Sequence, residues 1–331
     1  MPAVSIIITC YNYAHYLPQR LESVYSQTFR DCEVIFIDDR STDNSVEVFE
    51  KWGPKSFPTR TIYNTVNSGN AFLQWIKGLD IAQGEFIWMA DADDLAEPTL
   101  LETSVKLLRR NPQVSMAYVQ SIAIDKDGQP QGIFQHVANF KNPEIWEKDF
   151  IQNHPEEWAS HLLLNCDVGC PSSAVFRKSH YKNYAKVLPN YRIMGDWISW
   201  LNLLRHGALA FTAAPLNYYR CHAGSLCRST KNVRPSYFER THLTGEFLDE
   251  WEAPQKLRRE IYYELLEFWY YAFVIIRDPK ITLLEVFRAY VSGVRASHVD
   301  QWGIVCETAR WLLCKLRSHL GKGRAASHHV R

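Results

Sequence analysis

The first 110 residues alternate between continuous apolar runs and segments whose apolar residues recur every three or four positions. Four runs predict strands, at 4–9, 33–38, 60–64 and 85–90, and the first is continuously apolar, as is typical of a strand covered on both faces. The spacing of Leu17, Leu21 and Val24 predicts a helix after the first strand, and similar patterns follow the others. This alternation predicts an α/β fold with a mostly parallel sheet flanked by helices.

The pattern is weaker after residue 110, but individual elements can still be predicted. Asp127-Gly128 is typical of a hairpin turn, and 172–177 is typical of a strand. An amphipathic helix is predicted to begin at Asp196, and a short strand lies in "LNYYRCHAGSL". From about residue 236 the chain reads as helical. We therefore predict one domain over 1–230, with halves of about 1–119 and 120–230, and a helical region over 231–331.

Polar residues cluster where three of the predicted strands end. The clusters are Thr9–Asn12, Asp38–Asp43 and Asp91–Asp94. In parallel sheets, ligands bind beyond the carboxyl ends of the strands. We therefore expect these clusters to meet at one edge of the sheet and to form a binding site.

Asp91-Ala92-Asp93 places two carboxylates on the same side of an extended segment. Such a pair repels itself unless a cation or hydrogen-bond donors lie nearby. Together with phosphate oxygens it would bind Mn²⁺ or Mg²⁺. The alternative is a solvated loop that caps the helix predicted at 98–110, a role that suits Asp94 and Glu97.

Three other candidate positions also have two interpretations. Asp38 and Asp39 could form a turn and a helix cap, or accept hydrogen bonds from a nucleotide base or ribose. Asp196 could be a helix cap or a general base, and His222 could be an ordinary loop histidine.

Composition excludes several other classes of protein. The 331 residues are 46% hydrophobic and 22% charged with a net charge of +1, which gives no chain-wide basis for binding nucleic acid. Eight scattered cysteines and the lack of an apolar signal segment after Met1 predict a cytoplasmic protein. Cys166 and Cys170 are too isolated for a zinc site and are expected to be buried thiols.

The C-terminal segment is basic, since residues 277–331 hold 10 Lys or Arg against 4 Asp or Glu, a net charge of +6. Apolar residues from Trp302 to Leu320 follow helical spacing, and Arg310, Lys315 and Arg317 accompany them. The first interpretation is a helix packed on the domain predicted over 1–230. The alternative is a helix that lies on the anionic inner face of a membrane.

Several motifs in this order resemble those of family 2 glycosyltransferases, which have the GT-A fold. They are "SIIITCYNYAHYLPQRLESVYSQTFRDCEVIFIDDRSTDNS", "GEFIWMADADDLAEPTLLE" and "GDWISWLNLLRHG". The resemblance covers residues 3–225 and leaves the last hundred residues without a named motif.

The resemblance implies specific roles for individual residues. The residues implied to line the nucleotide pocket are Thr9, Tyr11, Asn12, Asp39 and Asp91. Asp39 is the implied acceptor for the uracil ring. Asp93 is the implied metal ligand, with His222 beside the metal and the diphosphate. Asp196 is the implied general base, although the family often has Glu-Asp where this chain has Gly195-Asp196.

The sequence also departs from the family where "ARN" is common, since Gln74-Trp75 stands in place of Arg-Asn. This departure puts one donor contact in doubt. The implied activity remains an inverting transfer from a nucleotide-sugar, with a UDP-sugar favoured, to a glycan or lipid-linked acceptor. In that chemistry a base deprotonates the acceptor hydroxyl and a metal stabilises the departing diphosphate.

Two other functions compete with this prediction. A sugar-nucleotide pyrophosphorylase would need a glycine-rich basic loop after the first strand, and "TCYNYAH" contains neither glycine nor Lys or Arg. A non-catalytic binding or scaffold protein on the same fold would lack the Asp pair or the base, and both are present.

Overall fold

The computed structural model describes residues 1–53, 55–134, 143–152, 166, 168–225, 236, 239–240, 242–244, 247 and 255–270. The chain divides into two compact units, Met1–Ser236 and Tyr237–Arg331. The predicted tail helix around Trp302–Leu320 lies outside the described residues. In the second unit, α9 spans Gln255–Tyr270 and buries Ile261 and Tyr262.

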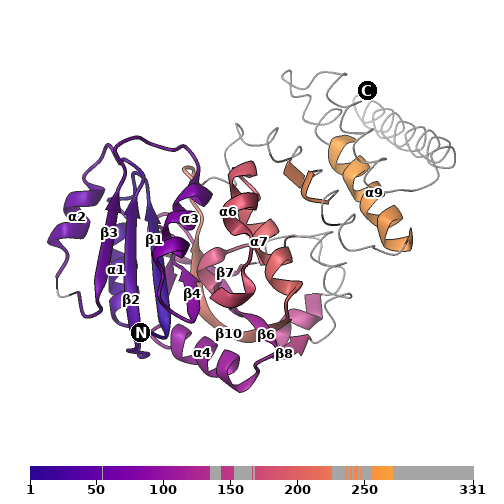
Figure 1. Ribbon diagram of the computed structural model, residues 1–331, viewed down its shortest axis with the longest axis horizontal. Helices are drawn as coiled ribbons and strands as arrows, with labels where there is room; N and C mark the ends of the chain where they lie inside the picture. The colour runs from indigo at the N-terminus through magenta and orange to yellow at the C-terminus, as the bar shows by residue number, and fades with distance from the viewer. Residues whose placement is uncertain are drawn as a thin grey trace, which may run out of the picture. The chain divides into compact units, whose positions relative to one another are not determined.

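The first unit is built on a ten-stranded mixed sheet (Figure 1). Its strands are β1 Val4–Cys10, β2 Cys32–Asp38, β3 Thr59–Tyr63, β4 Phe86–Met89, β5 Leu95–Ala96, β6 Val114–Ile124, β7 Pro130–Ile133, β8 Phe150–Gln152, β9 Ala174–Arg177 and β10 Ala208–Arg220. The main path runs β3-β2-β1-β4-β9-β6-β10-β5, with β7 paired to β6 and β8 to β10. The four predicted N-terminal strands are confirmed as a parallel block.

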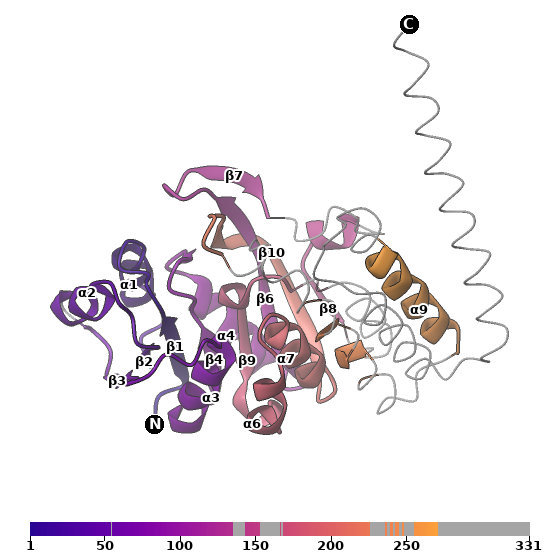
Figure 2. The same ribbon diagram turned by 90° about the horizontal axis from the view of Figure 1, so that it is seen from above.

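Helices cover both faces of this sheet. They are α1 Leu17–Tyr25, α2 Ser45–Lys51, α3 Ala71–Ile81, α4 Leu100–Arg110, α6 Tyr184–Val187 and α7 Gly195–Leu204. Short 3₁₀ helices lie at Pro143–Glu147, Pro171–Ser173, Lys178–His180 and Leu188–Asn190. Side chains of α1, α2 and α4 share one apolar core with β1, β2 and β4. Figure 2 shows α3, α6 and α7 on the opposite side of the sheet from α1 and α2.

The second half of this unit differs from the prediction in three ways. The predicted short strand is the end of β10, a 13-residue strand that pairs in parallel with β6. The predicted strand at 172–177 begins with a 3₁₀ turn, and its extended part, β9, runs antiparallel to β4 and β6. Helix α7 is not amphipathic, because eight of its ten residues are buried.

Other local predictions are confirmed. β6 and β7 form the expected hairpin, and Gly128 in its turn has φ of 87°. Cys166 and Cys170 are both buried, as expected. None of the helices in the described part of the chain is both long enough and apolar enough to span a membrane.

Candidate functional site

The loop that follows β4 carries three aspartates with different surroundings. Asp94 is buried, and its carboxylate accepts from the backbone N of Arg220 at 2.8 Å and from Sγ of Cys170 at 3.2 Å. Asp94 therefore ties the loop to β10, and the interpretation of Asp94 as a cap of the following helix is wrong. The half-buried Asp91 carboxylate makes no hydrogen bond to any described residue, so it is available to a ligand.

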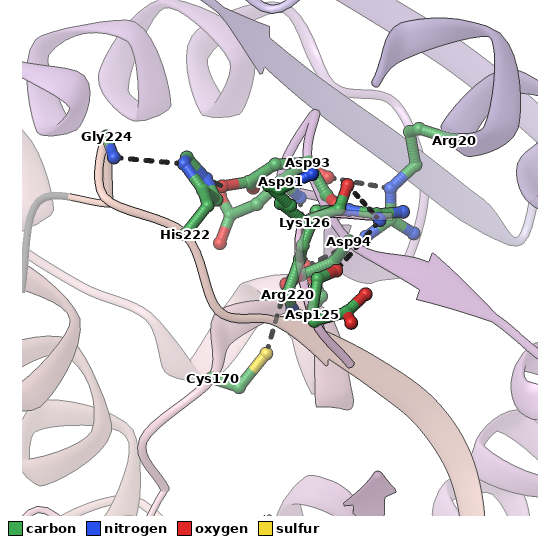
Figure 3. A network of polar contacts seen from close by, with 11 residues as sticks. Arg20, Asp91, Asp93, Asp94, Asp125, Lys126, Cys170, Arg220, His222 and Gly224 are labelled. Atoms are coloured by element: carbon green, nitrogen blue, oxygen red, sulfur yellow. Dashed lines mark hydrogen bonds and ion pairs between the residues drawn. The ribbon is translucent and has the colours of Figure 1, made fainter. Parts of the chain in front are cut away.

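Asp93 contacts His222, which lies just after β10 (Figure 3). Its Oδ2 lies 2.9 Å from Nε2 of His222. The backbone N of Gly224 donates to Nδ1 of the same ring at 3.1 Å, so in the neutral ring Nε2 carries the proton and donates to Asp93. The rings of Tyr16 and Tyr13 flank the imidazole at 5.0 and 5.9 Å. Two of the predicted site residues are thus brought together from positions 129 apart in the sequence.

The carboxylates of this loop perturb each other electrostatically. Burial, followed by the charge of Asp93, raises the pKa of Asp94 to about 6. Burial together with Asp94 and Asp93 raises the pKa of Asp91 well above its ordinary value, and Asp196 acts in the same direction. The repulsion expected from the sequence is therefore present, and Asp196 lies close enough to contribute to it.

Asp39 lies in a dense hydrogen-bond network at the end of β2. Its carboxylate accepts from side-chain amides of Asn64 at 2.7 Å, Gln74 at 3.0 Å and Asn67 at 3.3 Å. Ser68 adds its backbone N at 3.0 Å and its hydroxyl at 2.7 Å. These donors occupy the carboxylate, so a base N–H could reach it only by displacing one of them. The role of Asp39 in base recognition stays a prediction.

The segment after β1 contains the other predicted nucleotide-binding residues. Thr9 is half-buried at the end of β1, and Tyr11 is 44% exposed. Asn12 has φ of 60°, and its Oδ1 accepts from the backbone N of Thr42 at 2.7 Å and of Asp43 at 3.3 Å. Asn12 therefore holds the loops after β1 and β2 together, and a direct contact with a nucleotide stays a prediction.

The remaining carboxylates after β2 have the structural role that the turn interpretation gave them. Asp38 accepts from the backbone N of Ser41, three residues further on, at 2.8 Å, which holds the turn after β2. Asp43 accepts from the backbone N of Ser45 at 3.0 Å and of Ala14 at 3.0 Å. The contacts of Asp43 and Asn12 confirm that the ends of β1 and β2 meet.

Asp196 is the second residue of α7 and not its N-cap, which corrects the capping interpretation. The N-cap is Met194, which makes no side-chain capping bond. The half-buried Asp196 carboxylate accepts from the backbone N of Trp197 at 2.8 Å. A carboxylate in the first turn of a helix interacts favourably with the helix dipole.

The start of α3 packs against the chain that leads into α7. Asn70 donates from Nδ2 to the carbonyl oxygen of Tyr191 at 2.8 Å, and Arg192 donates to the carbonyl oxygen of Gly69 at 2.8 Å. A Cβ on Gly195 would lie 2.5 Å from the ring of Phe72, so glycine allows this close approach. Because the same segment supplies donors to Asp39, it connects the predicted base pocket with the predicted general base.

The loop after β4 that contains Asp91, Asp93 and Asp94 is called the acidic loop below. Three residues that hold it in place were not predicted from the sequence: Arg20, Ser172 and Arg220. Arg220 is buried and donates from Nε to the carbonyl oxygen of Asp93 at 2.7 Å. Its Nη2 donates to Oε1 of Gln19 at 2.7 Å. For Arg20 a signal was present, since a lone charged residue interrupts the apolar stripe of Leu17, Leu21 and Val24.

A divalent metal has two candidate protein ligands here, Asp93 and His222. Within the described residues, no group of three or more His, Cys, Asp or Glu side chains forms a preassembled metal site. A carboxylate oxygen of Asp93 is nevertheless a suitable donor for Mn²⁺ when a ligand completes the shell. Nε2 of His222 would become a donor once its proton moves to Nδ1, which breaks the contacts of the ring with Asp93 and Gly224. The residues present therefore fit a metal that arrives with its phosphate ligand.

The proteins similar to this chain include two relatives and one solved structure, described below. An uncharacterized glycosyltransferase of Haemophilus influenzae is 26% identical over 249 residues, covering 73% of this chain and 74% of the relative. The UDP-Glc:alpha-D-GlcNAc-diphosphoundecaprenol beta-1,3-glucosyltransferase WfaP of Escherichia coli is 29% identical, covering 68% and 80%. The structure of TarS 1–349 of S. aureus in complex with UDP-GlcNAc has a TM-score of 0.61 and is 16% identical in sequence. The match covers 90% of this chain and 82% of TarS 1–349.

The structural likeness supports the GT-A-like fold. It supports nothing beyond the fold, because the sequence identity is too low. The sequence comparison goes further, because the model of glycosyl transferase family 2 matches residues 5–184, more than half of the 331 residues. The order of strands, the acidic loop after β4 and this match agree, and the chain belongs to glycosyl transferase family 2.

Proposed function

We propose that this protein is an inverting glycosyltransferase that uses a UDP-linked sugar and builds a surface polysaccharide. The acceptor would be a hydroxyl of a glycan or a lipid-linked sugar. The name of WfaP states a UDP-glucose donor and a diphosphoundecaprenol-linked acceptor, and TarS was solved with UDP-GlcNAc, which supports both choices. The reaction forms a glycosidic C–O bond and breaks the bond between C1 of the sugar and the diphosphate.

The observation that carries the proposal is the contact of Asp93 with His222 beside the free Asp91 carboxylate. In α/β sheets this edge is where nucleotides bind. The proposed roles are ribose or diphosphate contact for Asp91 and contact with the nucleoside for Thr9, Tyr11, Asn12 and Asp39. Residues of about 1–119 would then form the nucleotide half, and about 120–230 the acceptor half.

Asp93 and His222 would hold a Mn²⁺ or Mg²⁺ ion together with oxygens of the diphosphate, and the ion would neutralise charge on the leaving group. Asp91 would orient the donor from the same loop. Asp196 would accept the proton of the acceptor hydroxyl, for which its half-burial and its nearness to other carboxylates suit it.

The variant Asp196→Asn tests this proposal. Asn is similar in size to Asp and keeps an oxygen for the backbone N of Trp197, so the fold and UDP binding should be retained. Transfer should fall by at least ~100-fold, the usual scale for loss of a positioned base. Asp31→Asn, at an exposed position, is the matched control.

Three measurements on each variant separate the outcomes: melting temperature, affinity for UDP and release of UDP from a panel of nucleotide sugars with an acceptor. Near-normal turnover in a well-folded Asp196→Asn protein would falsify the role of Asp196. If the wild-type protein binds UDP but turns over no donor, the non-catalytic scaffold becomes the better description.

A further inference from the structure

Arg20 of α1 lies fully buried beneath the acidic loop, with 0% of its surface exposed. Its Nε donates to the carbonyl oxygen of Asp91 at 2.7 Å, and its Nη2 donates to Oγ of Ser172 at 3.0 Å. In Figure 3, Arg20 and His222 lie on opposite sides of the loop. The Arg20 guanidinium thus holds one side of the loop, and the opposite side of the loop faces His222.

Ser172 completes the hold on Asp91. Its hydroxyl oxygen accepts from the backbone N of Asp91 at 3.0 Å, as well as from Arg20. Its own carbonyl oxygen accepts from Nε1 of Trp88 in β4 at 2.7 Å, and Trp88 also lies under the guanidinium at 5.6 Å. Both backbone polar groups of Asp91 are therefore fixed, one directly by Arg20 and the other through Ser172.

The burial of Arg20 is costly and calls for a compensating role. Nη1 of Arg20 has no hydrogen-bond partner among the residues that the structure describes. A guanidinium stays charged in proteins, and a buried unpaired charge is normally strongly destabilising. The opposing charges here are Asp91, Asp93 and Asp94, which all act on Arg20. The buried cation offsets part of the repulsion among the three carboxylates before any ligand arrives.

We propose that Arg20 is a positioning residue that fixes the Asp91–Asp93 pair and sets, through its fixed charge, how strongly the loop attracts a divalent cation. The proposal rests on the proposed function, since it concerns the same site. Its two parts have different consequences. Loss of the hydrogen bonds displaces Asp91, whereas loss of the charge makes the loop more negative.

Two substitutions separate these parts. Arg20→Met removes both the charge and the hydrogen bonds, and it should lower the melting temperature, because the neighbouring carboxylates and two hydrogen-bond acceptors lose their buried cationic partner. Arg20→Lys keeps the charge but cannot make the same pair of bonds. Arg110→Met, on the exposed end of α4, is the matched control.

The readouts are melting temperature, binding of Mn²⁺ alone by paramagnetic resonance, and kcat and KM for donor turnover. In Arg20→Met we expect Mn²⁺ to bind about tenfold more tightly, because a nearby positive charge is gone. We also expect kcat to fall by ~10- to 100-fold with a smaller change in KM, because Asp91 is displaced. Arg20→Lys should show a wild-type affinity for Mn²⁺ and a reduced kcat.

A merely structural role would weaken Mn²⁺ binding and lower the melting temperature together. Unchanged or weaker Mn²⁺ binding in a well-folded Arg20→Met protein overturns the charge role, and wild-type kcat in both variants overturns the positioning role. If Arg20→Met does not fold, wild-type kcat in Arg20→Lys still overturns the proposal. The proposed metal site fails separately if wild-type and Asp93→Asn proteins bind Mn²⁺ equally.

Discussion

Replacement of Gly195 by Ala tests the packing that positions Asp196. The new Cβ would lie 2.5 Å from Cγ and Cδ2 of Phe72, whereas carbon atoms pack at ~3.5–4.0 Å. The overlap is therefore about 1 Å, and overpacking of this kind costs ~1–3 kcal/mol. The better helix propensity of Ala recovers at most about 1 kcal/mol. We expect a net loss of stability of ~0–3 kcal/mol.

The larger expected effect is on rate, because Asp196 is the next residue. A displacement of ~1 Å at a reacting group costs up to ~100-fold, so kcat should fall by ~10- to 100-fold while UDP affinity changes little. The second change Phe72→Leu removes ring atoms from the overlap and should restore part of the lost turnover in the double variant.

The assay is UDP release under saturating donor, combined with thermal melting of each variant. Gly53→Ala is the control, because a Cβ at Gly53 meets no atom within 4 Å. If Gly195→Ala keeps kcat within twofold of wild type, the close contact does not position Asp196. If Phe72→Leu fails to recover any turnover, the loss has another cause than the ring.

Three further predictions concern the base pocket, the metal and alkaline pH. Asp39→Ala should weaken the binding of uridine nucleotides more than that of other nucleotides. It should also cost ~1–3 kcal/mol of stability, because buried donors lose their acceptor. Equal weakening for all bases in a binding titration would contradict base recognition by Asp39. UDP affinity should fall when a chelator replaces Mn²⁺, and equal affinity in both titrations contradicts the role of Asp93. Burial raises the pKa of the Cys32 thiol from 9.0 to about 12, so above pH 9.0 the unfolded chain loses this proton first and stability falls by up to about 1.4 kcal/mol per pH unit. Denaturant unfolding should show a shallower decline between these pH values in Cys32→Ala, and identical slopes would contradict the prediction.

The parts of the fold that were predictable are those that local patterns specify. β1 and β2 read as continuous apolar runs because the sheet buries them on both faces. The acidic loop was predictable because its polar residues follow such a run directly. β10 was underestimated because Pro215 and mixed polar residues weaken its pattern, and its length depends on pairing with β6.

The support of the site was harder to predict, because it depends on contacts between distant segments. Arg20 and Ser172 are 152 positions apart, and no spacing rule connects a helix residue with a 3₁₀ turn. The network around Asp39 likewise depends on where α3 begins, which places Ser68 and Gln74 beside β2. The sequence indicated candidate site residues, whereas the residues that hold their loops in place had to be found in the structure.

The bond between Arg220 and Gln19 joins residues 201 positions apart, and this has a consequence for folding. The acidic loop cannot reach its final arrangement until β10 has been synthesised and has paired with β6. Until then β6 lacks its parallel neighbour, and unpaired strand edges favour aggregation. Non-local pairing of this kind also slows folding. Fragments that end before residue 208 should therefore be poor folding units, and the site should be among the last regions of the first unit to form.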